Sequence, residues 1–444
     1  MNSITRAMGQ VKDQLPRLIE HHVLDFLASS QWRGRVRELD PLTTVLLFIC
    51  QIMHRNTAIN HLRHVAAMTC SAAAFCKARQ RLPLALLEHI SKAVTRDVAC
   101  ASDEVGRWRG HRVWKADMTG CSMPDTPALQ AHFGQPTGQQ PGCGFPVASL
   151  LILCNAAGFI MQTLVMPLQS GEAGYIPQLH KSLKRNDLLI YDRAGCSYAQ
   201  LALGHLRSLH AIFRMHQKQI VSFRSGRKHA GEVGKNKRKG LPRTKWLKRL
   251  GRCDQLVCYF KPIEKPRWMS QQQHDTLPAS LVLRELRYAA KRRGFRSRSI
   301  TLLTTLLDPQ SYPAEELAEQ YLSRWEIETN FRHLKQTMNM DVLKCKTVDG
   351  VKKELAVFIL VYNLVRLVML RASRRQDVPL DRISFIDALR WLCDGAFDRD
   401  LIVNPKRTGR VEPRVVKRRM KEYRWMKQPR SELREQLMGK TVRD

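Results

Sequence analysis

The chain has 444 residues, of which 44% are hydrophobic, which excludes a disordered tail and allows a sizeable buried core. This length suits roughly three domains of about 150 residues, or two with a large insertion. The chain carries 74 Lys and Arg against 39 Asp and Glu, a net charge of +35. An excess of this size, spread over most of the chain, indicates a polyanionic partner, most commonly nucleic acid.

A membrane surface is the competing partner for such a charge. The longest apolar run, residues 355–370, contains Asn363 and Arg366 and is shorter than the ~20 residues that span a bilayer. The N-terminus lacks the apolar segment of a signal peptide. The twelve cysteines form no C-x-x-C pair, which indicates neither a zinc site nor a disulfide framework. We therefore expect no membrane, no export and a cytoplasmic location.

Residues 1–105 are predicted to form an all-helical N-terminal domain. Within it, the segments 57–68 and 71–82 resemble two short helices, the second with Ser71 as N-cap. Its basic side chains suggest either DNA contact, as in a helix-turn-helix, or simple solvation of the helix; they are Lys77, Arg79 and Arg81.

Residues 106–215 show the pattern of a mixed α/β sheet. Apolar, partly β-branched runs bounded by Gly, Pro or Asn predict strands at 111–117, 146–155, 159–167, 187–192 and 211–215. Helices are predicted at 174–184 and 199–209 between the later strands. Three strands followed by alternating helix and strand indicate one mixed sheet.

Residues 216–298 read as a basic, β-rich insertion. From Arg224 to Arg252 the chain has twelve Lys and Arg and one acidic residue, Glu232. Residues 299–375 return to the strand-then-helix pattern and include a buried helix at 350–373. Residues 376–444 are predicted to be a helical, basic C-terminal tail, with eleven Lys and Arg between 401 and 430.

Two predicted strands end in an aspartate, Asp117 after "RVWKA" and Asp192 after "DLLIY". Functional groups collect at the carboxyl ends of strands in open α/β sheets. Aspartate at a strand end is also a good turn former, so neither residue is decisive alone.

The segment "YLSRWEIETNFRHLK", residues 321–335, places four polar side chains on one ridge of a predicted helix. At about 100° per residue they fall within about 60° of one another; they are Tyr321, Arg324, Glu328 and Lys335. A solvated stripe with an ordinary i,i+4 ion pair between Arg324 and Glu328 gives the same pattern.

Chemistry favours a functional ridge. Carboxylates at Asp117, Asp192 and Glu328 would repel one another unless cations neutralised them. Hard oxygen ligands suit Mg²⁺ or Mn²⁺, and two such ions about 4 Å apart can promote in-line phosphoryl displacement. Arginine and lysine on the same ridge can hold a phosphodiester.

These residues resemble the DDE transposases of the insertion-sequence-four family. The family signature Y-(2)-R-(3)-E-(6)-K is matched without a gap by the ridge, and residues 116–134 and 187–198 are similar to the segments that carry the two catalytic aspartates. The second segment reads "DRAG" where the family frequently has D-R-G-F. Residues 304–336, 353–366 and 71–82 also fit the family pattern, so the resemblance covers most of the chain.

The resemblance implies an RNase H-like catalytic core interrupted by the insertion between Asp192 and Glu328. It implies cut-and-paste movement of a DNA element by a homodimer, with two Mg²⁺ or Mn²⁺ ions on Asp117, Asp192 and Glu328. The DNA partners would be the element's terminal inverted repeats and the target DNA, in the bacterial cytoplasm.

The resemblance also implies that Tyr321, Arg324 and Lys335 hold the phosphates of the element end. Relatives form a hairpin in which a flipped base stacks on tryptophan, for which Trp325, Trp246 and Trp268 are candidates. Two alternatives remain open: a catalytically inactive, DNA-binding relative that acts as a repressor, and a host nuclease with the same fold.

Overall fold

One mixed sheet runs through the molecule. The computed structural model describes residues 15–30, 38–102, 105–215, 222–227, 243–289, 299–394, 400–405 and 426–440. Within these residues ten strands form a sheet with the order β4-β3-β2-β5-β6-β10-β9-β8-β7, and β1 pairs with β2. The strands are β1 Arg107–Trp108, β2 His111–Ser122, β3 Val147–Asn155, β4 Ile160–Pro167, β5 Leu188–Tyr191, β6 His210–Arg214, β7 Thr244–Gly251, β8 Asp254–Phe260, β9 Ser280–Ala289 and β10 Ser299–Thr304.

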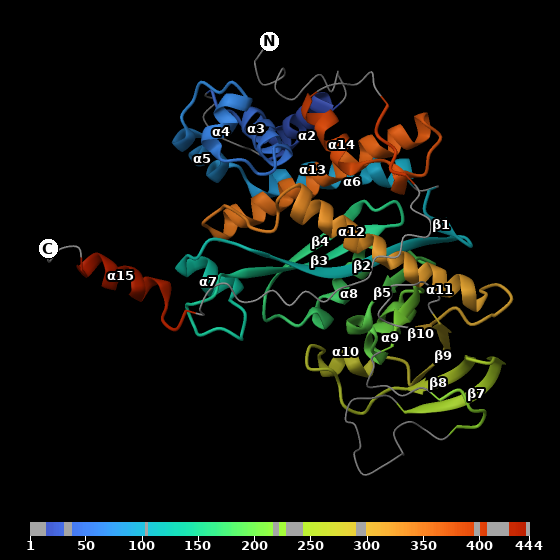
Figure 1. Ribbon diagram of the computed structural model, residues 1–444. Coiled ribbons are helices and arrows are strands. Elements are labelled where there is room, and N and C mark those ends of the chain that lie inside the picture. Colours follow the sequence, from blue (N-terminus) through green and yellow to red (C-terminus); the bar gives the residue numbers. More distant parts are fainter. Residues whose placement is uncertain are drawn as a thin grey trace.

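The directions of the strands divide the sheet into two parts. Strands β2, β3 and β4 pair antiparallel, and β5 and β6 continue from β2 in parallel. From β6 onward every pairing is antiparallel, through β10 and β9 to β8 and β7. The predicted mixed α/β sheet is confirmed. The strands of the basic segment extend it rather than forming a separate sheet (Figure 1).

Helices precede, interrupt and follow the strands. Side chains cap several of them, as Ser71 does for α5 by accepting a hydrogen bond from the Ala74 N–H. The helices are α2 Leu15–Ser29, α3 Pro41–Met53, α4 Ile59–Val65, α5 Ala72–Arg81, α6 Leu84–Ser102, α7 Pro127–Phe133, α8 Ile176–Leu179, α9 Tyr198–Leu206, α10 Gln271–Asp275, α11 Ala314–Leu322, α12 Glu326–Arg332, α13 Val348–Arg375, α14 Phe385–Asp394 and α15 Arg430–Lys440.

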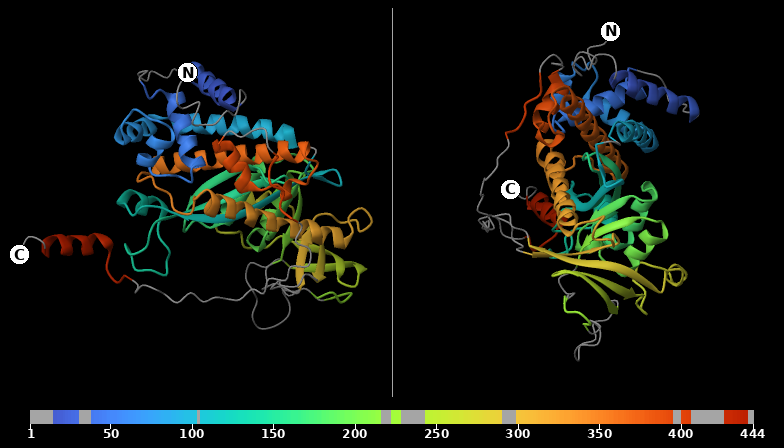
Figure 2. Two further views of the ribbon diagram at one scale, coloured as in Figure 1. Left: turned by 45° about the horizontal axis from the view of Figure 1, so that its top comes forward. Right: turned by 90° about the vertical axis from the view of Figure 1, so that its right-hand side faces the viewer.

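The sheet is buried on both faces. On one face, Leu150 and Ile152 of β3 share a core with α3, α6 and α13. On the other, Trp114 of β2 and Leu189 of β5 pack against α8 and α9. Figures 1 and 2 show α13 lying between the N-terminal helices and the sheet. Because residues of a strand alternate between faces, β3 also contributes Leu151 and Leu153 to the second core.

Helix α13 is the central helix of the larger core. In the described part of the chain it is the one helix long and apolar enough to cross a membrane, yet 78% of its most apolar window is buried inside the protein. The two polar residues of its apolar run have structural roles. Asn363 exchanges two hydrogen bonds with the backbone of Ile160 in the edge strand β4, at 2.9 and 2.7 Å, and Arg366 donates to the Ala157 carbonyl. They attach the helix to the sheet edge.

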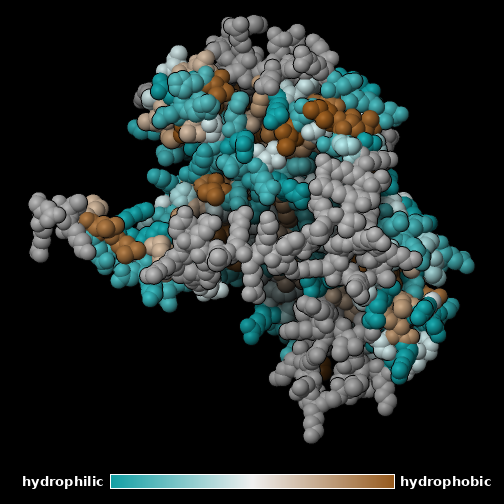
Figure 3. Space-filling view, in the orientation of Figure 1, coloured by the Kyte–Doolittle hydropathy of each residue, from teal (hydrophilic) through white to brown (hydrophobic). Residues whose placement is uncertain are grey.

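The C-terminal helix α15 projects from the body beside α7 (Figures 1 and 2). Arg430 anchors its first turn, because the guanidinium lies 3.3 Å from Asp125 and 3.9 Å from the centroid of the Phe145 ring. Leu437 and Met438 are 67% and 72% exposed, and Figure 3 shows apolar surface on this helix. Residues 406–425, most of the basic stretch 401–430 of the predicted tail, lie outside the described residues.

His333 lies at the start of a short π-helical turn, His333–Thr337. Its ring stacks on Phe385 of α14 with centroids 4.2 Å apart and an interplanar angle of 7°. Burial, followed by the charge of Arg366, lowers the pKa of His333 to about 4. The folded protein therefore keeps this imidazole neutral at pH values where the unfolded chain protonates it.

We expect this histidine to make stability fall in mild acid. Between its ordinary pKa of about 6.5 and about 4, the unfolded state binds a proton that the folded state rejects, so lowering the pH favours unfolding. From pH 7 to 5.5 this should remove about 1 kcal/mol of unfolding free energy, measured by urea denaturation. His333→Gln should lose that part of the pH dependence, whereas His61→Gln at an exposed position of α4 should keep it. Equal pH dependence in all three proteins would contradict the assignment.

Candidate active site

The register of two parallel strands brings the predicted aspartates together. Val113 of β2 pairs with Leu188 of β5, and Lys115 pairs with Ile190. The same offset places Asp192, the residue after β5, beside Asp117. Adjacent strands lie about 4.8 Å apart, so the two carboxylates are neighbours on one face of the sheet.

Asp117 does not end its strand, so that expectation was wrong. β2 continues to Ser122, because its second half still pairs with β3. β5 ends at Tyr191. The second half of β2, after Asp117, is therefore not paired with β5. The site lies at the carboxyl end of β5 but in the middle of β2.

The segment 321–335 is not one regular helix, and this too corrects the sequence analysis. It consists of the end of α11, a 3₁₀ turn Ser323–Trp325, α12 and the π-helical turn His333–Thr337. A 3₁₀ turn is tighter and a π turn wider than an α turn, so the four polar residues do not share one straight ridge. Tyr321 and Arg324 are 2% and 5% exposed, which excludes a solvated stripe for these two.

Arg324 and Tyr321 link the signature segment to the aspartates. The Arg324 guanidinium donates to Asp117 Oδ2 at 2.6 Å, and its other amino group lies 3.7 Å from Glu328 Oε1. The Tyr321 hydroxyl donates to Asp192 Oδ1 at 3.3 Å. Asp117 and Asp192 on the sheet thus contact side chains of the segment that carries Glu328.

The electrostatics of this cluster follow from its burial. Burial raises the pKa of Asp117 against the opposing effect of Arg324, and the nearby charge of Asp192 raises it further. Burial also raises the pKa of Tyr321 to about 12, so its hydroxyl stays a hydrogen-bond donor at neutral pH. Burial alone would lower the pKa of Arg324, but the charge of Asp117 raises it overall.

Lys335 lies farther along the segment. Its ammonium is 3.1 Å from Asp341 Oδ1. This partner is outside the carboxylate cluster, and Lys335 lies seven residues after Glu328 in the sequence. Trp325 is half-buried, with its ring centroid 5.9 Å from the Arg324 guanidinium carbon.

The donor set fits a hard divalent cation, although the carboxylates now face a guanidinium. In the described part of the chain, no three His, Cys, Asp or Glu side chains converge closely enough to hold a metal. Asp117 and Glu328 instead converge on Arg324. The oxygens are nevertheless of the type that Mg²⁺ and Mn²⁺ prefer, and the Asp192 and Glu328 side chains are 32% and 44% exposed. Asp117, Asp192 and Glu328 could hold such an ion once Arg324 left Asp117.

Glu172 is a fourth carboxylate that sequence reasoning missed. It lies on the 3₁₀ turn Glu172–Gly174, which packs against the turn Arg193–Gly195 that follows Asp192. Burial raises the pKa of Glu172, and the charges of Asp117 and Asp192 raise it further. Its surroundings, "QSGEAGY", have the composition of an ordinary loop, so no local signal distinguishes it.

The departure "DRAG" from the family pattern also has a structural explanation. A Cβ added at Gly195 would lie 2.2 Å from Cδ1 of Tyr191, and the Tyr191 ring is 2% exposed. The turn after Asp192 therefore requires glycine at this position, one residue later than in the frequent form.

The N-terminal helix pair does not present its three basic residues to one surface. Lys77 and Arg81 of α5 are exposed. Arg79 instead points inward, with its guanidinium 4.7 Å from the Phe48 ring centroid and 2.8 Å from Gln51 Oε1. Cation–π and hydrogen-bond contacts within the protein account for Arg79, whereas DNA contact by Lys77 and Arg81 stays a prediction.

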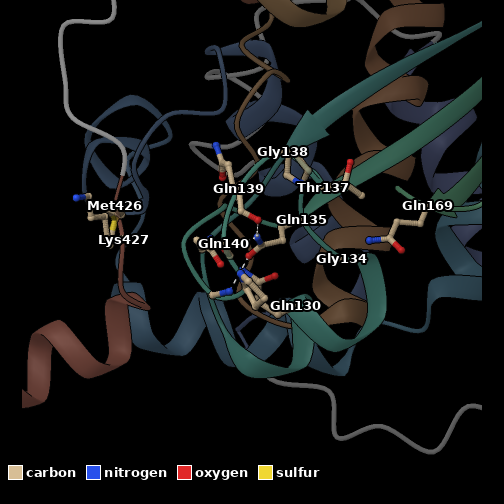
Figure 4. Close-up of a pocket in the computed structure, with 13 residues that line it drawn as sticks. Gln130, Gly134, Gln135, Thr137, Gly138, Gln139, Gln140, Gln169, Met426 and Lys427 are labelled. Atoms are coloured by element: carbon tan, nitrogen blue, oxygen red, sulfur yellow. Dashed lines mark hydrogen bonds between the residues drawn. The ribbon is translucent and has the colours of Figure 1, made fainter.

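A hollow of about 730 Å³ lies between the α7–β3 loop and Met426 and Lys427 (Figure 4). Gln135 shapes the loop by accepting hydrogen bonds from the N–H groups of Gly142 and Gly144. The described residues that line the hollow include no carboxylate, histidine or cysteine. It therefore lacks the groups for acid–base or metal chemistry, and the carboxylate cluster remains the candidate active site.

A transposase DDE domain matches residues 108–364, which contain the whole carboxylate cluster. The match spans more than half of the chain, and the protein belongs to this family of DDE transposases, of the insertion-sequence-four type.

Two curated proteins are similar in sequence. The transposase InsG for insertion sequence element IS4 of Escherichia coli (strain K12) is 24% identical over 340 residues, 71% of this chain and 70% of that protein. A probable transposase for insertion sequence element IS5377 of Geobacillus stearothermophilus is 31% identical over 94 residues, 21% of this chain and 24% of that protein.

Among solved structures, the cryo-EM structure of the piggyBac transposase synaptic complex with hairpin DNA gives a TM-score of 0.44 at 8% identity. The match covers 88% of this chain and 78% of that one.

Proposed function

We propose that this DNA transposase moves an insertion sequence by cut-and-paste, through metal-dependent phosphodiester hydrolysis and strand transfer at the element ends. The observation that carries the proposal is the β2–β5 register, which places Asp117 beside Asp192, together with Arg324, which joins Asp117 to Glu328. Family membership supports DNA as the substrate.

We further propose an RNase H-like core. The order β4-β3-β2-β5-β6, with three antiparallel strands followed by two parallel ones, supports this assignment. In such a core the first aspartate lies on the central strand and the second follows the neighbouring parallel strand, the positions of Asp117 and Asp192.

Asp117, Asp192 and Glu328 would hold two Mg²⁺ or Mn²⁺ ions. A bound ion of this kind supplies Lewis-acid activation of the attacking and leaving oxygens. The protein's own part is to position the DNA. Arg324 would grip a phosphate next to the cut, and Tyr321 would donate a hydrogen bond there. Lys335, farther along the segment, would hold another phosphate of the element end.

Further basic surface lies on the edge strand β7, where Lys245, Lys248 and Arg249 are exposed. Charge on an edge strand also protects against aggregation, but the net charge of +35 favours a nucleic-acid contact. We propose that a homodimer pairs two element ends and then engages target DNA in the bacterial cytoplasm.

Removing any one carboxylate should abolish cutting without abolishing binding. We expect Asp117→Asn, Asp192→Asn and Glu328→Gln each to lower the rate of strand cleavage by about 10³-fold or more, measured on labelled element ends in Mg²⁺. Gel-shift affinity for the same ends should stay nearly unchanged. Glu319→Gln, at an exposed position of α11, is the matched control and should cut normally.

Cleavage that persists in any of the three variants would overturn the site assignment. A wild-type protein that binds the ends but never cuts them would favour an inactive repressor. Equal cutting of DNA with and without the terminal repeats would favour a host nuclease.

The three candidate tryptophans differ in their distance from the carboxylates. Trp268 packs against Gly174, next to Glu172: a Cβ on Gly174 would lie 3.1 Å from Cβ of Trp268. Trp325 adjoins Arg324. Trp246 is on β7, five strands from β5 in the sheet order, and therefore about 24 Å away at ~4.8 Å per strand.

We expect Trp268→Ala and Trp325→Ala to slow hairpin formation by about 10–100-fold, because stacking of a base on an aromatic ring contributes about 1–3 kcal/mol. First-strand nicking should be nearly unchanged. Fluorescence of 2-aminopurine at the terminal base measures the flipping directly. Trp246→Ala should behave as the wild type, and a selective defect in that variant would contradict the proposed arrangement.

A further inference from the structure

Two ion pairs join β2 to the signature segment. Lys115 Nζ lies 2.7 Å from Glu326 Oε2, and Arg324 Nη1 lies 2.6 Å from Asp117 Oδ2. Lys115 and Asp117 are two positions apart on the strand and therefore face the same side of the sheet. On β2 the basic Lys115 precedes the acidic Asp117, and in the signature segment the basic Arg324 precedes the acidic Glu326. The first residue on each side pairs with the second on the other.

The two pairs fix the start of α12 on the sheet at two points. Arg324 lies in the 3₁₀ turn Ser323–Trp325, and Glu326 is the first residue of α12. Because both side chains attach to the same face of β2, they limit rotation of the helix start as well as its translation. Glu328, two residues further along α12, depends on that restraint for its position beside Arg324.

The Lys115 side chain is buried and held by an ion pair. The residue is 4% exposed, and in the described part of the chain its ammonium donates to Glu326, whose side chain is 55% exposed. A buried ammonium needs a partner to offset its lost hydration. Ile327, the residue after Glu326, is fully buried in the core, so the pair lies where α12 packs on the sheet.

The other pair must open during the proposed reaction. Cation binding at Asp117 and phosphate binding at Arg324 both compete with this pair, because they use the same carboxylate oxygen and the same guanidinium. When the Arg324–Asp117 pair opens, the Lys115–Glu326 pair still joins β2 to the signature segment.

We propose that Lys115 and Glu326 are positioning residues that keep α12 in register on β2 while Arg324 exchanges Asp117 for a DNA phosphate. This inference rests on the proposed function. The pair touches neither the DNA nor the metal. It acts through α12 on Glu328, and hence on metal affinity and on the cleavage rate.

The test uses the full-length protein with element-end DNA. Lys115→Met removes the charge at nearly constant length, Glu326→Gln removes the partner charge, and the double variant closes a cycle. Lys115→Arg keeps the charge. Glu316→Gln is the matched control, because Glu316 forms an exposed ion pair on α11 with Arg109 at 2.5 Å, a type that contributes little.

Three quantities are measured: Mn²⁺ affinity by calorimetry, end-binding by gel shift, and the cleavage rate as a function of Mg²⁺ concentration. Loss of a residue that supports a metal ligand lowers metal affinity or activity by about 10–100-fold, and we expect this for Lys115→Met. End-binding should change less than about 2-fold. The double variant should be no worse than Lys115→Met, since interacting residues are not additive, and Lys115→Arg should recover most of the loss.

Unchanged Mn²⁺ affinity and cleavage in Lys115→Met, as in Glu316→Gln, would overturn the inference, and so would fully additive effects in the double variant. If Lys115→Met fails to fold, Glu326→Gln replaces it as the test, because an amide is tolerated at this exposed position. A wild-type Mn²⁺ affinity in Glu326→Gln would then overturn the inference. A wild-type protein that neither binds Mn²⁺ nor cuts DNA would instead overturn the proposed function.

Discussion

The guanidinium of Arg324 is the contact around which the site is organised. It is buried, and it neutralises Asp117 on the sheet while lying next to Glu328 of the following helix, α12. Without a cation between them, a buried aspartate and its carboxylate neighbours would repel one another or take up protons. The arginine therefore makes it possible for acidic groups from distant parts of the sequence to be assembled before any ligand binds.

The sheet gives that contact its geometry, and the basic segment is part of the sheet. Arg284 of β9 is fully buried, forms an ion pair with Asp254 of β8 and donates to the Tyr312 carbonyl just before α11. Strands β8 and β9 are thereby fastened to the start of α11, the helix that leads into the signature segment. A DNA molecule bound to their outer edge would be held by the same rigid framework that carries Tyr321 and Arg324.

Much of the fold could be predicted from the sequence because its signals are local. The strands β3 to β6, the buried helix α13 and the Ser71 cap follow from apolar runs and capping residues. The two polar interruptions of α13 could not be interpreted, since Asn363 and Arg366 act on an edge strand that is distant in sequence. The inward direction of Arg79 could not be predicted for the same reason: its partners Phe48 and Gln51 lie on another helix.

The site was predictable to the extent that a recognisable motif marks it. Asp117, Asp192, Glu328, Tyr321 and Arg324 are brought together as the motif suggested. Asp117 was taken for a strand end because the apolar alternation stops there, whereas pairing with β3 continues. Glu172 and the Lys115–Glu326 pair had no local signal, because only the packing of the sheet, its connecting loops and α12 brings them near the aspartates.

A crystal structure of the protein with a cut element end and Mn²⁺ tests the central claim most directly, because anomalous scattering locates the ion. We expect Mn²⁺ bound between Asp117 and Asp192, with Glu328 turned toward it and the Arg324 guanidinium moved from Asp117 to a DNA phosphate. Manganese bound elsewhere, or an intact Arg324–Asp117 pair beside a bound and cut DNA end, would contradict the account.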